Sequence, residues 1–334
     1  MTAMLELEGI SKRFVKSLDL AEKLANRFGA DLREEVVRAV DNVSFTVSPG
    51  EIVGVVGESG CGKSTLGRMI AGILPPTEGS ILYKGQPFIN ATTGSRPDTA
   101  LALKVQMIFQ DPFSSLNPRK QVIDIITEAP LHHGLISSAE KKSFATEMLA
   151  QVGLDGDALM RYPHQFSGGQ RQRVGIARAL AVSPEFLVCD ESIAALDVSI
   201  QAQIINLFMK LRDSLGLTYL FISHDIGVIE HIADQVVVMY LGRVVEKGPV
   251  DALFSSPNHP YTHALLEGVP RLEAGKRDFV PVSGEIPSPL DPPGGCHFHP
   301  RCPFATDRCR QERPALKAVA GGHLSACHRN DETG

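Results

Sequence analysis

One glycine-rich segment, residues 57–65, constrains the fold of this chain more than any other part of the sequence. It reads Gly57-Glu58-Ser59-Gly60-Cys61-Gly62-Lys63-Ser64-Thr65 and fits the pattern G-x-x-x-x-G-K-[ST]. A continuous apolar run precedes it at residues 52–56, and an apolar stretch with helical character follows it to about residue 73. Such a run is typical of a strand that is buried on both faces of a parallel sheet. The segment therefore predicts a strand–loop–helix unit within an α/β fold.

The same segment, called the phosphate loop below, predicts a nucleotide-phosphate site. Glycines let backbone N–H groups converge on phosphate oxygens, and the following helix adds its positive N-terminal end. Lys63 is expected to reach the β- and γ-phosphates, and the Ser64 hydroxyl to bind Mg²⁺. The residues expected to contact the nucleotide are Gly57, Ser59, Gly60, Cys61, Gly62, Lys63, Ser64 and Thr65.

Two further apolar runs end in side chains with catalytic potential. Residues 186–189 lead into Asp190 and Glu191, and residues 218–222 lead towards His224. Taken alone, such acids can be helix caps and such a histidine can be a surface residue. Because carboxyl ends of parallel strands lie at one edge of a sheet, we expect all three beside the phosphate loop. Asp190 is then predicted to hold Mg²⁺, Glu191 to polarise the attacking water, and His224 to sense the γ-phosphate.

The remaining pattern outlines two domains. Strand-like and helix-like runs alternate, which predicts an α/β core with parallel strands. Residues 5–10 and 43–47 read as short strands, and the charged residues 18–36 as an exposed, helix-prone insertion. Residues 111–172 are expected to form a helical subdomain. The composition shifts to Pro, Gly, His and Cys near residue 255, which predicts a nucleotide-binding domain over 1–255 and a small C-terminal extension over 256–334.

Composition excludes some functional classes. Hydrophobic residues make up 43% of the chain and the net charge is −5, so a broad nucleic-acid surface is not favoured. We find no apolar run of membrane-spanning length and no secretory signal. We therefore expect a cytosolic chain that reaches a membrane only by docking on a partner that spans it.

Residues 166–173 identify a family. Ser167-Gly168-Gly169-Gln170 opens a predicted helix and offers a second anion-binding helix start. This segment resembles the signature motif of ABC transporter ATPases, with Phe166 in place of the usual Leu. The resemblance implies that the signature of one subunit closes over the γ-phosphate held by the other. Hydrolysis then requires a dimer of nucleotide-binding domains.

Other family motifs are present, and they imply ATP and Mg²⁺ as cofactors. Gln110 matches the Q-loop residue, residues 195–197 match the D-loop, and His224 matches the switch histidine. Phe14 is the candidate for stacking on adenine, with a core phenylalanine as the alternative. The resemblance implies three Mg²⁺ contacts, Ser64, Gln110 and Asp190, and three catalytic residues, Glu191, His224 and Gln110.

One departure from the family pattern follows Glu191. Ser192-Ile193-Ala194 stands where the family normally has Pro-Thr-Ser. The departure leaves the hydrolysis rate and the coupling to the partner site open. The departure also leaves open that the chain is a regulatory subunit that does not hydrolyse ATP. The presence of Glu191 and His224 argues against that alternative.

Four stretches resemble one branch of the family, the oligopeptide/dipeptide importer ATPases: residues 110–119, 162–165, 197–203 and 259–262. The branch implies a peripheral protein at the cytoplasmic face of the inner membrane. Its implied partners are a second, different ATPase subunit, two membrane permease subunits and an extracytoplasmic peptide-binding protein, with no nucleic acid. Alternatives are a nickel-chelate or sugar cargo, or a soluble ABC ATPase acting on nucleic acid or ribosomes. A single phosphate loop and the absence of heptad repeats argue against the soluble class.

Four cysteines crowd the C-terminal extension: Cys296, Cys302, Cys309 and Cys327. Thiolates suit iron–sulfur clusters and zinc, but the close C-x₂₋₄-C pairs typical of zinc sites are missing. The branch resemblance favours a [4Fe–4S] cluster. Zinc remains an alternative, as do free or disulfide-bonded thiols. Cys61 and Cys189 are expected only to pack within the nucleotide motifs.

Overall fold

The computed structural model describes residues 2–28, 34–94, 97–111, 115–268, 284–319 and 322–331. Its main sheet has the strand order β11-β12-β10-β9-β3-β8-β7-β6. The five strands from β9 to β6 run parallel, which confirms the predicted α/β core. Their bounds are β9 (Gln235–Tyr240), β3 (Ile52–Val56), β8 (Thr218–Ile222), β7 (Phe186–Asp190) and β6 (Val105–Ile108).

A second, antiparallel sheet packs over one face of the main sheet. It comprises β2 (Glu35–Val47), β1 (Leu5–Lys16), β4 (Glu78–Tyr83) and β5 (Gln86–Asn90). Strand β3 is buried on both faces because its side chains alternate between two cores. Val53 and Val55 pack in the core shared with the antiparallel sheet and α2 (Lys63–Ile70), and Ile52 and Val56 pack in the opposite core.

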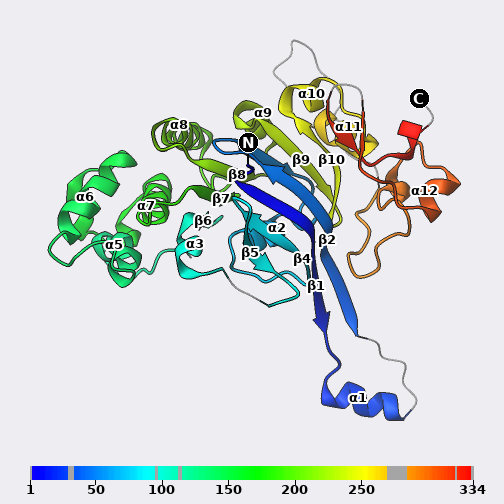
Figure 1. Ribbon diagram of the computed structural model, residues 1–334, viewed down its shortest axis with the longest axis horizontal. Coiled ribbons are helices and arrows are strands. Elements are labelled where there is room, and N and C mark those ends of the chain that lie inside the picture. Colours follow the sequence, from blue (N-terminus) through cyan, green and yellow to red (C-terminus); the bar gives the residue numbers. More distant parts are fainter. Residues whose placement is uncertain are drawn as a thin grey trace.

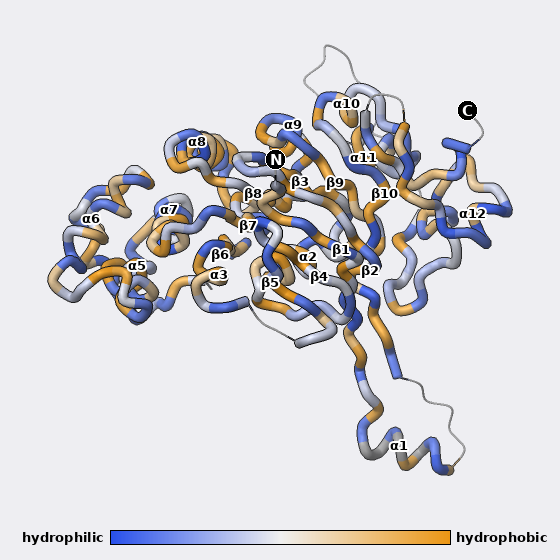
Figure 2. The backbone as a smooth tube through the Cα atoms, viewed as in Figure 1, coloured by the Kyte–Doolittle hydropathy of each residue, from blue (hydrophilic) through white to orange (hydrophobic). Residues whose placement is uncertain are grey.

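Helices cover the other face of the main sheet. The opposite core includes buried side chains of α8 (Val198–Leu215), α9 (Ile226–Ile232) and α10 (Val250–Ser255). Figure 2 shows hydrophobic stretches along the central strands and alternating hydrophilic and hydrophobic turns on α8. No helix in the described part of the chain is long and apolar enough to span a membrane.

Three helices form a group at one end of the molecule (Figure 1). They are α5 (Val122–His132), α6 (Lys141–Gln151) and α7 (Gly168–Leu180), and they pack on one another. Two 3₁₀ turns, Gly156–Met160 and Pro163–Gln165, connect α6 to α7, and the short α3 (Thr99–Lys104) leads into β6. Helices α5 and α6 and both 3₁₀ turns lie within residues 111–172, the span expected for the helical subdomain, whereas α7 continues to Leu180 and α3 precedes that span. Residues 112–114 fall outside the described residues, and the bounds of the subdomain stay a prediction.

The predicted short strands at 5–10 and 43–47 were wrong in length. Strands β1 and β2 continue as a projecting two-stranded arm, in which Lys12 pairs with Val40 and Lys16 with Glu35 (Figure 1). The arm mixes exposed apolar side chains such as Phe14 and Val15 with charged ones, and they do not alternate strictly, so its strand character rests on backbone hydrogen bonds that the sequence pattern does not reveal. Helix α1 (Leu20–Arg27) lies at the end of the arm, as expected of an exposed insertion, although residues 29–33 fall outside the described residues.

The C-terminal extension packs onto the main sheet. Strand β12 (Leu324–Ser325) pairs with β10 (Arg243–Pro249) and with β11 (Lys317–Ala318). Helix α11 (Pro260–Glu267) contributes Tyr261 to the core of the nucleotide-binding part, where Phe298 joins it. The extension also contains α12 (Asp307–Gln311) and two 3₁₀ turns, His299–Arg301 and His328–Asp331. The proposed boundary at residue 255 stays a prediction.

Candidate functional site

The phosphate loop runs from the end of β3 to the start of α2 in a conformation that requires glycine. Gly57 has φ 151° and Gly62 has φ 106°, both in the region that L side chains rarely adopt. A Cβ on Gly57 would lie 2.2 Å from the carbonyl oxygen of Met239, and one on Gly62 would lie 2.1 Å from that of Ala39. The loop is thus enclosed by backbone on two sides. Ser59 and Gly60 stand exposed on the loop.

Lys63 lies at the first position of α2 with its side chain directed back into the loop. The side chain is buried, and its ammonium donates hydrogen bonds to the carbonyl oxygens of Gly57 (2.8 Å) and Glu58 (3.0 Å). An anion held by the N–H groups of the loop would therefore lie next to this positive charge. The Cys61 side chain is buried in the adjacent core, as expected.

Ser64 and Asp190 meet beside the loop. The Ser64 hydroxyl donates to Asp190 Oδ1 at 2.8 Å, and Asp190 is buried at the end of β7. Burial raises the pKa of Asp190 and the charge of Glu191 acts in the same direction, while the Ser64 hydrogen bond opposes them. A hydroxyl and a buried carboxylate are oxygen donors of the kind that Mg²⁺ prefers. The pair therefore fits the predicted magnesium contacts.

Three strand ends converge on Glu191. Gln110, after β6, donates from Nε2 to Glu191 Oε2 at 2.7 Å. His224, after β8, places Nδ1 3.5 Å from the same oxygen. Glu191 itself has φ 45°, a strained conformation for a residue with a side chain, and its N–H donates to the Ile222 carbonyl. The structure thus gathers the three predicted catalytic side chains around one carboxylate.

The signature segment begins α7 and packs on the D-loop region. Ser167 is the N-cap, its hydroxyl accepts from the Gln170 N–H, and its own N–H donates to Gln170 Oε1. A Cβ on Gly168 would lie 3.3 Å from Leu196, and one on Gly169 only 2.5 Å from Ile200 Cγ2. The two glycines thus allow close contact between α7 and the start of α8.

The segment Ser192-Ile193-Ala194, which departs from the family pattern just before the D-loop, packs into the main core through Ile193. Ile193 is buried in the main core, and its carbonyl accepts a hydrogen bond from Gln201 Nε2 on α8. Asp197 occupies the N-cap position of α8. The apolar side chain of Ile193 therefore fits the core, while Asp190 keeps its hydrogen bond with Ser64 and Glu191 its hydrogen bond with Gln110.

Phe14 is not part of the core. Its side chain is 44% exposed on the β1–β2 arm, and the Lys12 ammonium lies 5.4 Å from its ring centroid. An exposed aromatic face suits base stacking. Its role towards adenine stays a prediction.

The four cysteines of the extension are partly buried and influence one another. Burial raises the pKa of Cys296 to about 11, and Cys309, Cys327 and Cys302 act in the same direction. Four thiols suit a soft metal. Nevertheless, no group of three or more His, Cys, Asp or Glu side chains within the described residues is arranged to hold a metal ion. The predicted iron–sulfur cluster therefore has no support from the placement of these side chains.

Two residues that contact the phosphate loop were not predicted from the sequence. Arg301 forms an ion pair with Glu58, and the Tyr261 hydroxyl accepts the Glu58 N–H. Both lie in the C-terminal extension, more than 200 positions away along the chain. A contact between such distant segments leaves no local pattern that could have revealed it.

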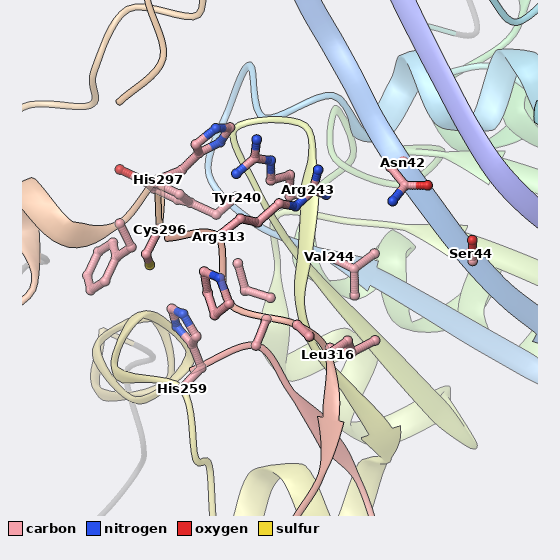
Figure 3. Close-up of a pocket in the computed structure, with 15 residues that line it drawn as sticks. Asn42, Ser44, Tyr240, Arg243, Val244, His259, Cys296, His297, Arg313 and Leu316 are labelled. Carbon is pink, nitrogen blue, oxygen red and sulfur yellow. The ribbon is translucent and has the colours of Figure 1, made fainter. Parts of the chain in front are cut away.

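A separate cavity of about 420 Å³ lies between β2, the β9–β10 hairpin and the extension (Figure 3). Figure 3 shows Arg243, Arg313 and His297 together at one end, with Asn42 and Ser44 on β2 at the other. Both arginines pair with Asp41, at 2.7 and 3.4 Å. The predicted nucleotide residues do not line this cavity.

Comparison with known proteins agrees with this geometry. A family model described as ABC transporter matches residues 40–194, which contain the phosphate loop, the signature segment and both acids. A model described as oligopeptide/dipeptide transporter, C-terminal region, matches residues 245–309. The solved dimeric structure of the ATP-binding cassette MJ0796 bound to ADP and Pi is similar, with a TM-score of 0.61 and 28% identity. The match covers 74% of this chain and 99% of that one.

Curated relatives are similar over nearly the whole chain. The dipeptide transport ATP-binding protein DppF of Haemophilus influenzae is 48% identical, over 91% of this chain and 92% of the relative. DppF of Escherichia coli is 46% identical over 97% and 96%, and the oligopeptide transport ATP-binding protein AppF of Bacillus subtilis is 50% identical over 87% and 89%. The chain therefore belongs to the ATP-binding proteins of ABC transporters, in the branch that carries the oligopeptide/dipeptide transporter C-terminal region.

Proposed function

We propose that this chain hydrolyses ATP to power the import of di- and oligopeptides through an ABC transporter. The observation that carries the hydrolytic part is the convergence of Gln110 and His224 on Glu191, next to the Ser64–Asp190 pair. The peptide cargo is supported by relatives named for dipeptide and oligopeptide transport and by the matching C-terminal region.

In this proposal, the nucleotide is held mainly by the chain's own loop. The N–H groups of the phosphate loop and the Lys63 ammonium bind the phosphates, and Phe14 stacks on the base. Ser64, Asp190 and Gln110 would bind Mg²⁺, which would neutralise developing phosphate charge. Glu191 takes a proton from the attacking water, and His224 contacts the γ-phosphate.

Hydrolysis would need a second ATPase subunit. The Ser167-Gly168-Gly169-Gln170 segment starts a helix of 13 residues and so presents N–H groups and a positive dipole end. This end would cap the γ-phosphate of the facing subunit. Closure would then move α5, α6 and α7 as a group and pass the motion to the membrane subunits.

The assembly we propose has four kinds of component. They are this chain, a second and different ATPase subunit, two membrane permease subunits, and an extracytoplasmic peptide-binding protein. The chain would then act peripherally, at the cytoplasmic face of the inner membrane. The relatives' names as transport ATP-binding proteins support this arrangement.

The deciding experiment is ATP-dependent uptake by the complete complex in vesicles. Labelled dipeptides, longer peptides, a nickel chelate and a sugar are compared, with Lys63→Ala as the inactive control. Peptide uptake that Lys63→Ala abolishes supports the proposal. Uptake of only the nickel chelate or the sugar would replace the peptide cargo while keeping the transport role, and hydrolysis without any uptake would remove the cargo assignment.

We also propose that Cys296, Cys302, Cys309 and Cys327 bind a [4Fe–4S] cluster, with zinc as the alternative. The donor chemistry of four thiols close enough to raise one another's pKa supports a bound metal. Anaerobic purification followed by iron, sulfide and zinc analysis tests this, with Cys189→Ala as a control outside the extension. Absence of all three elements would leave the four thiols free or disulfide-bonded.

A further inference from the structure

The C-terminal extension holds the second residue of the phosphate loop through two side chains. Arg301 donates from both terminal nitrogens to the carboxylate of Glu58, at 2.7 and 3.0 Å. The hydroxyl oxygen of Tyr261 accepts the backbone N–H of Glu58 at 2.8 Å. The carboxylate and the N–H of one loop residue are therefore both fixed by the extension.

This contact is enclosed by aromatic rings. The side chain of Arg301 is 3% exposed, and its guanidinium lies 5.8 Å from the ring centre of Tyr240 and 5.9 Å from that of Phe298. The rings of Tyr240, Tyr261 and Phe298 contact one another and are all buried. A bidentate pair in such surroundings fixes both position and orientation of its partners.

Lys63 holds the same stretch of loop from the other side. Its ammonium donates to the carbonyl oxygens of Gly57 and Glu58. A displacement of Glu58 would therefore move the acceptors that position the Lys63 ammonium. The extension is therefore linked to the phosphate loop through Glu58, and its Ile286 and Pro289 line a small pocket beside Ser59 and Gly60.

The extension does not depend on this contact for its attachment. Strand β12 pairs with β10, where Glu246 is fully buried and lies 3.0 Å from His323 Nε2. The carboxylate of Glu246 also accepts the N–H groups of Asn258 and His259. Because the extension is anchored there, the Arg301 and Tyr261 contacts act chiefly on the loop.

We infer that Arg301 and Tyr261 are positioning residues for ATP binding: through Glu58 they hold the phosphate loop in the conformation that places Lys63. Nucleotide affinity is then set partly by the C-terminal extension. Since the loop binds substrate and transition state alike, loss of the contact is expected to change affinity more than turnover.

The test measures ATP binding by the full-length chain and ATP hydrolysis by the assembled transporter. We expect Arg301→Gln to raise both the Kd and the KM for ATP about tenfold, which is within the usual range of coupling between two sites. The kcat is expected to change by less than about twofold, as for loss of uniform binding. Arg301→Lys keeps one charged donor and is expected to recover part of the affinity.

A double-mutant cycle separates this role from general destabilisation. Glu58→Gln is expected to lower ATP affinity as much as Arg301→Gln does. The double variant should bind ATP no more weakly than either single variant, because all three variants remove the same ion pair. Lys317→Gln breaks an ion pair with Asp331 elsewhere in the extension and serves as the matched control with unchanged ATP affinity.

Each outcome decides the inference. A folded Arg301→Gln chain with unchanged Kd and KM overturns it, as does a loss in Glu58→Gln that Arg301→Gln does not share. If Arg301→Gln fails to fold, Tyr261→Phe decides, since it keeps the buried ring and removes only the acceptor of the Glu58 N–H. The inference rests on the proposed nucleotide site, which fails separately if Lys63→Ala leaves ATP binding unchanged.

Discussion

Gln110 donates a hydrogen bond to the carboxylate of Glu191 at 2.7 Å and so joins the end of β6 to the end of β7. Gln110 lies two residues beyond the end of β6, in the segment that leads towards α5. The residue that would polarise water is therefore linked directly to the segment that leads into the helical group. A movement of that group would therefore reach the carboxylate of Glu191 through the side chain of Gln110.

Replacement of Glu191 tests the hydrolytic role. In Glu191→Gln, the amide keeps the size of the side chain but cannot take a proton, so we expect kcat to fall by about 10²- to 10⁴-fold. ATP binding should persist, because Lys63 and the loop are unchanged, and an ATP-bound dimer should accumulate. Phosphate release and gel filtration with ATP measure both effects.

The control for Glu191→Gln is Glu230→Gln, which changes an exposed acid on α9. It should leave hydrolysis unchanged. Undiminished turnover in Glu191→Gln would contradict the assigned role and favour a different base.

Much of this site could be predicted because it depends on local patterns. The glycines of the phosphate loop, the apolar runs before Asp190 and before His224, and the N-cap at Ser167 are all written in short stretches of sequence. Parallel strands then bring their carboxyl ends together whatever lies between them. The grouping of Gln110 and His224 around Glu191 follows from that geometry.

Other features could not be predicted because they join distant or polar segments. The arm formed by β1 and β2 carries apolar and charged residues without strict alternation, so its strands were expected to be shorter. The pairing of β12 with β10 and the contact of Arg301 with Glu58 are tertiary events between segments with no shared local signal. The thiols of the extension showed the donor chemistry of a metal site but not how the side chains are arranged.

Replacement of Phe14 tests the expected adenine contact. Stacking of a base on an aromatic ring contributes about 1–3 kcal/mol, so Phe14→Ala should weaken ATP binding by about tenfold. Phe14→Tyr should retain affinity because it keeps the ring. Phe28→Ala is the matched control, since Phe28 is 84% exposed and lies beyond α1. Equal affinity of Phe14→Ala and wild type would show that another residue contacts the base.

The raised pKa of Asp190 predicts a dependence of stability on pH. Burial favours the neutral carboxyl in the folded state, so the pKa lies above its usual value of 3.8. The folded chain therefore holds its proton more tightly than the unfolded chain, and the stability falls as the pH rises above that value. Without Mg²⁺, Asp190→Asn should raise the Tm at pH 7, by ~2 °C for each kcal/mol gained.

Two further measurements test whether the charge of Asp190 lowers the stability of the folded chain. The difference in Tm between Asp190→Asn and wild type should vanish below the usual carboxyl pKa, where both chains are neutral at this position. Mg-ATP should stabilise the wild type more than Asp190→Asn, because the amide is a poorer cation ligand while Lys63 and the phosphate loop still bind the nucleotide in both chains. A lower Tm for Asp190→Asn at pH 7 would mean that the Ser64 hydrogen bond outweighs the cost of burying the charge.

Alanine substitutions at two glycines of α7 separate the effect of packing at the signature segment from the effect of helix propensity. A Cβ on Gly169 would lie 2.5 Å from Ile200 Cγ2, whereas one on Gly175, in the same helix, would have no atom within 4 Å. Alanine at Gly175 should therefore stabilise α7 by about 0.5–1 kcal/mol, the difference between the two residues in a helix. Alanine at Gly169 should instead push α7 away from the start of α8.

The consequence of Gly169→Ala should appear in closure of the dimer and not in binding by one subunit. The phosphate loop is untouched, so the Kd for ATP of the isolated chain should stay the same while hydrolysis by the assembled transporter falls. Gly175→Ala should raise the Tm and leave hydrolysis intact. If both variants lost hydrolysis equally, the loss would arise from stiffening of α7. If neither did, the contact between Gly169 and Ile200 would have no part in presenting the signature segment to the facing subunit.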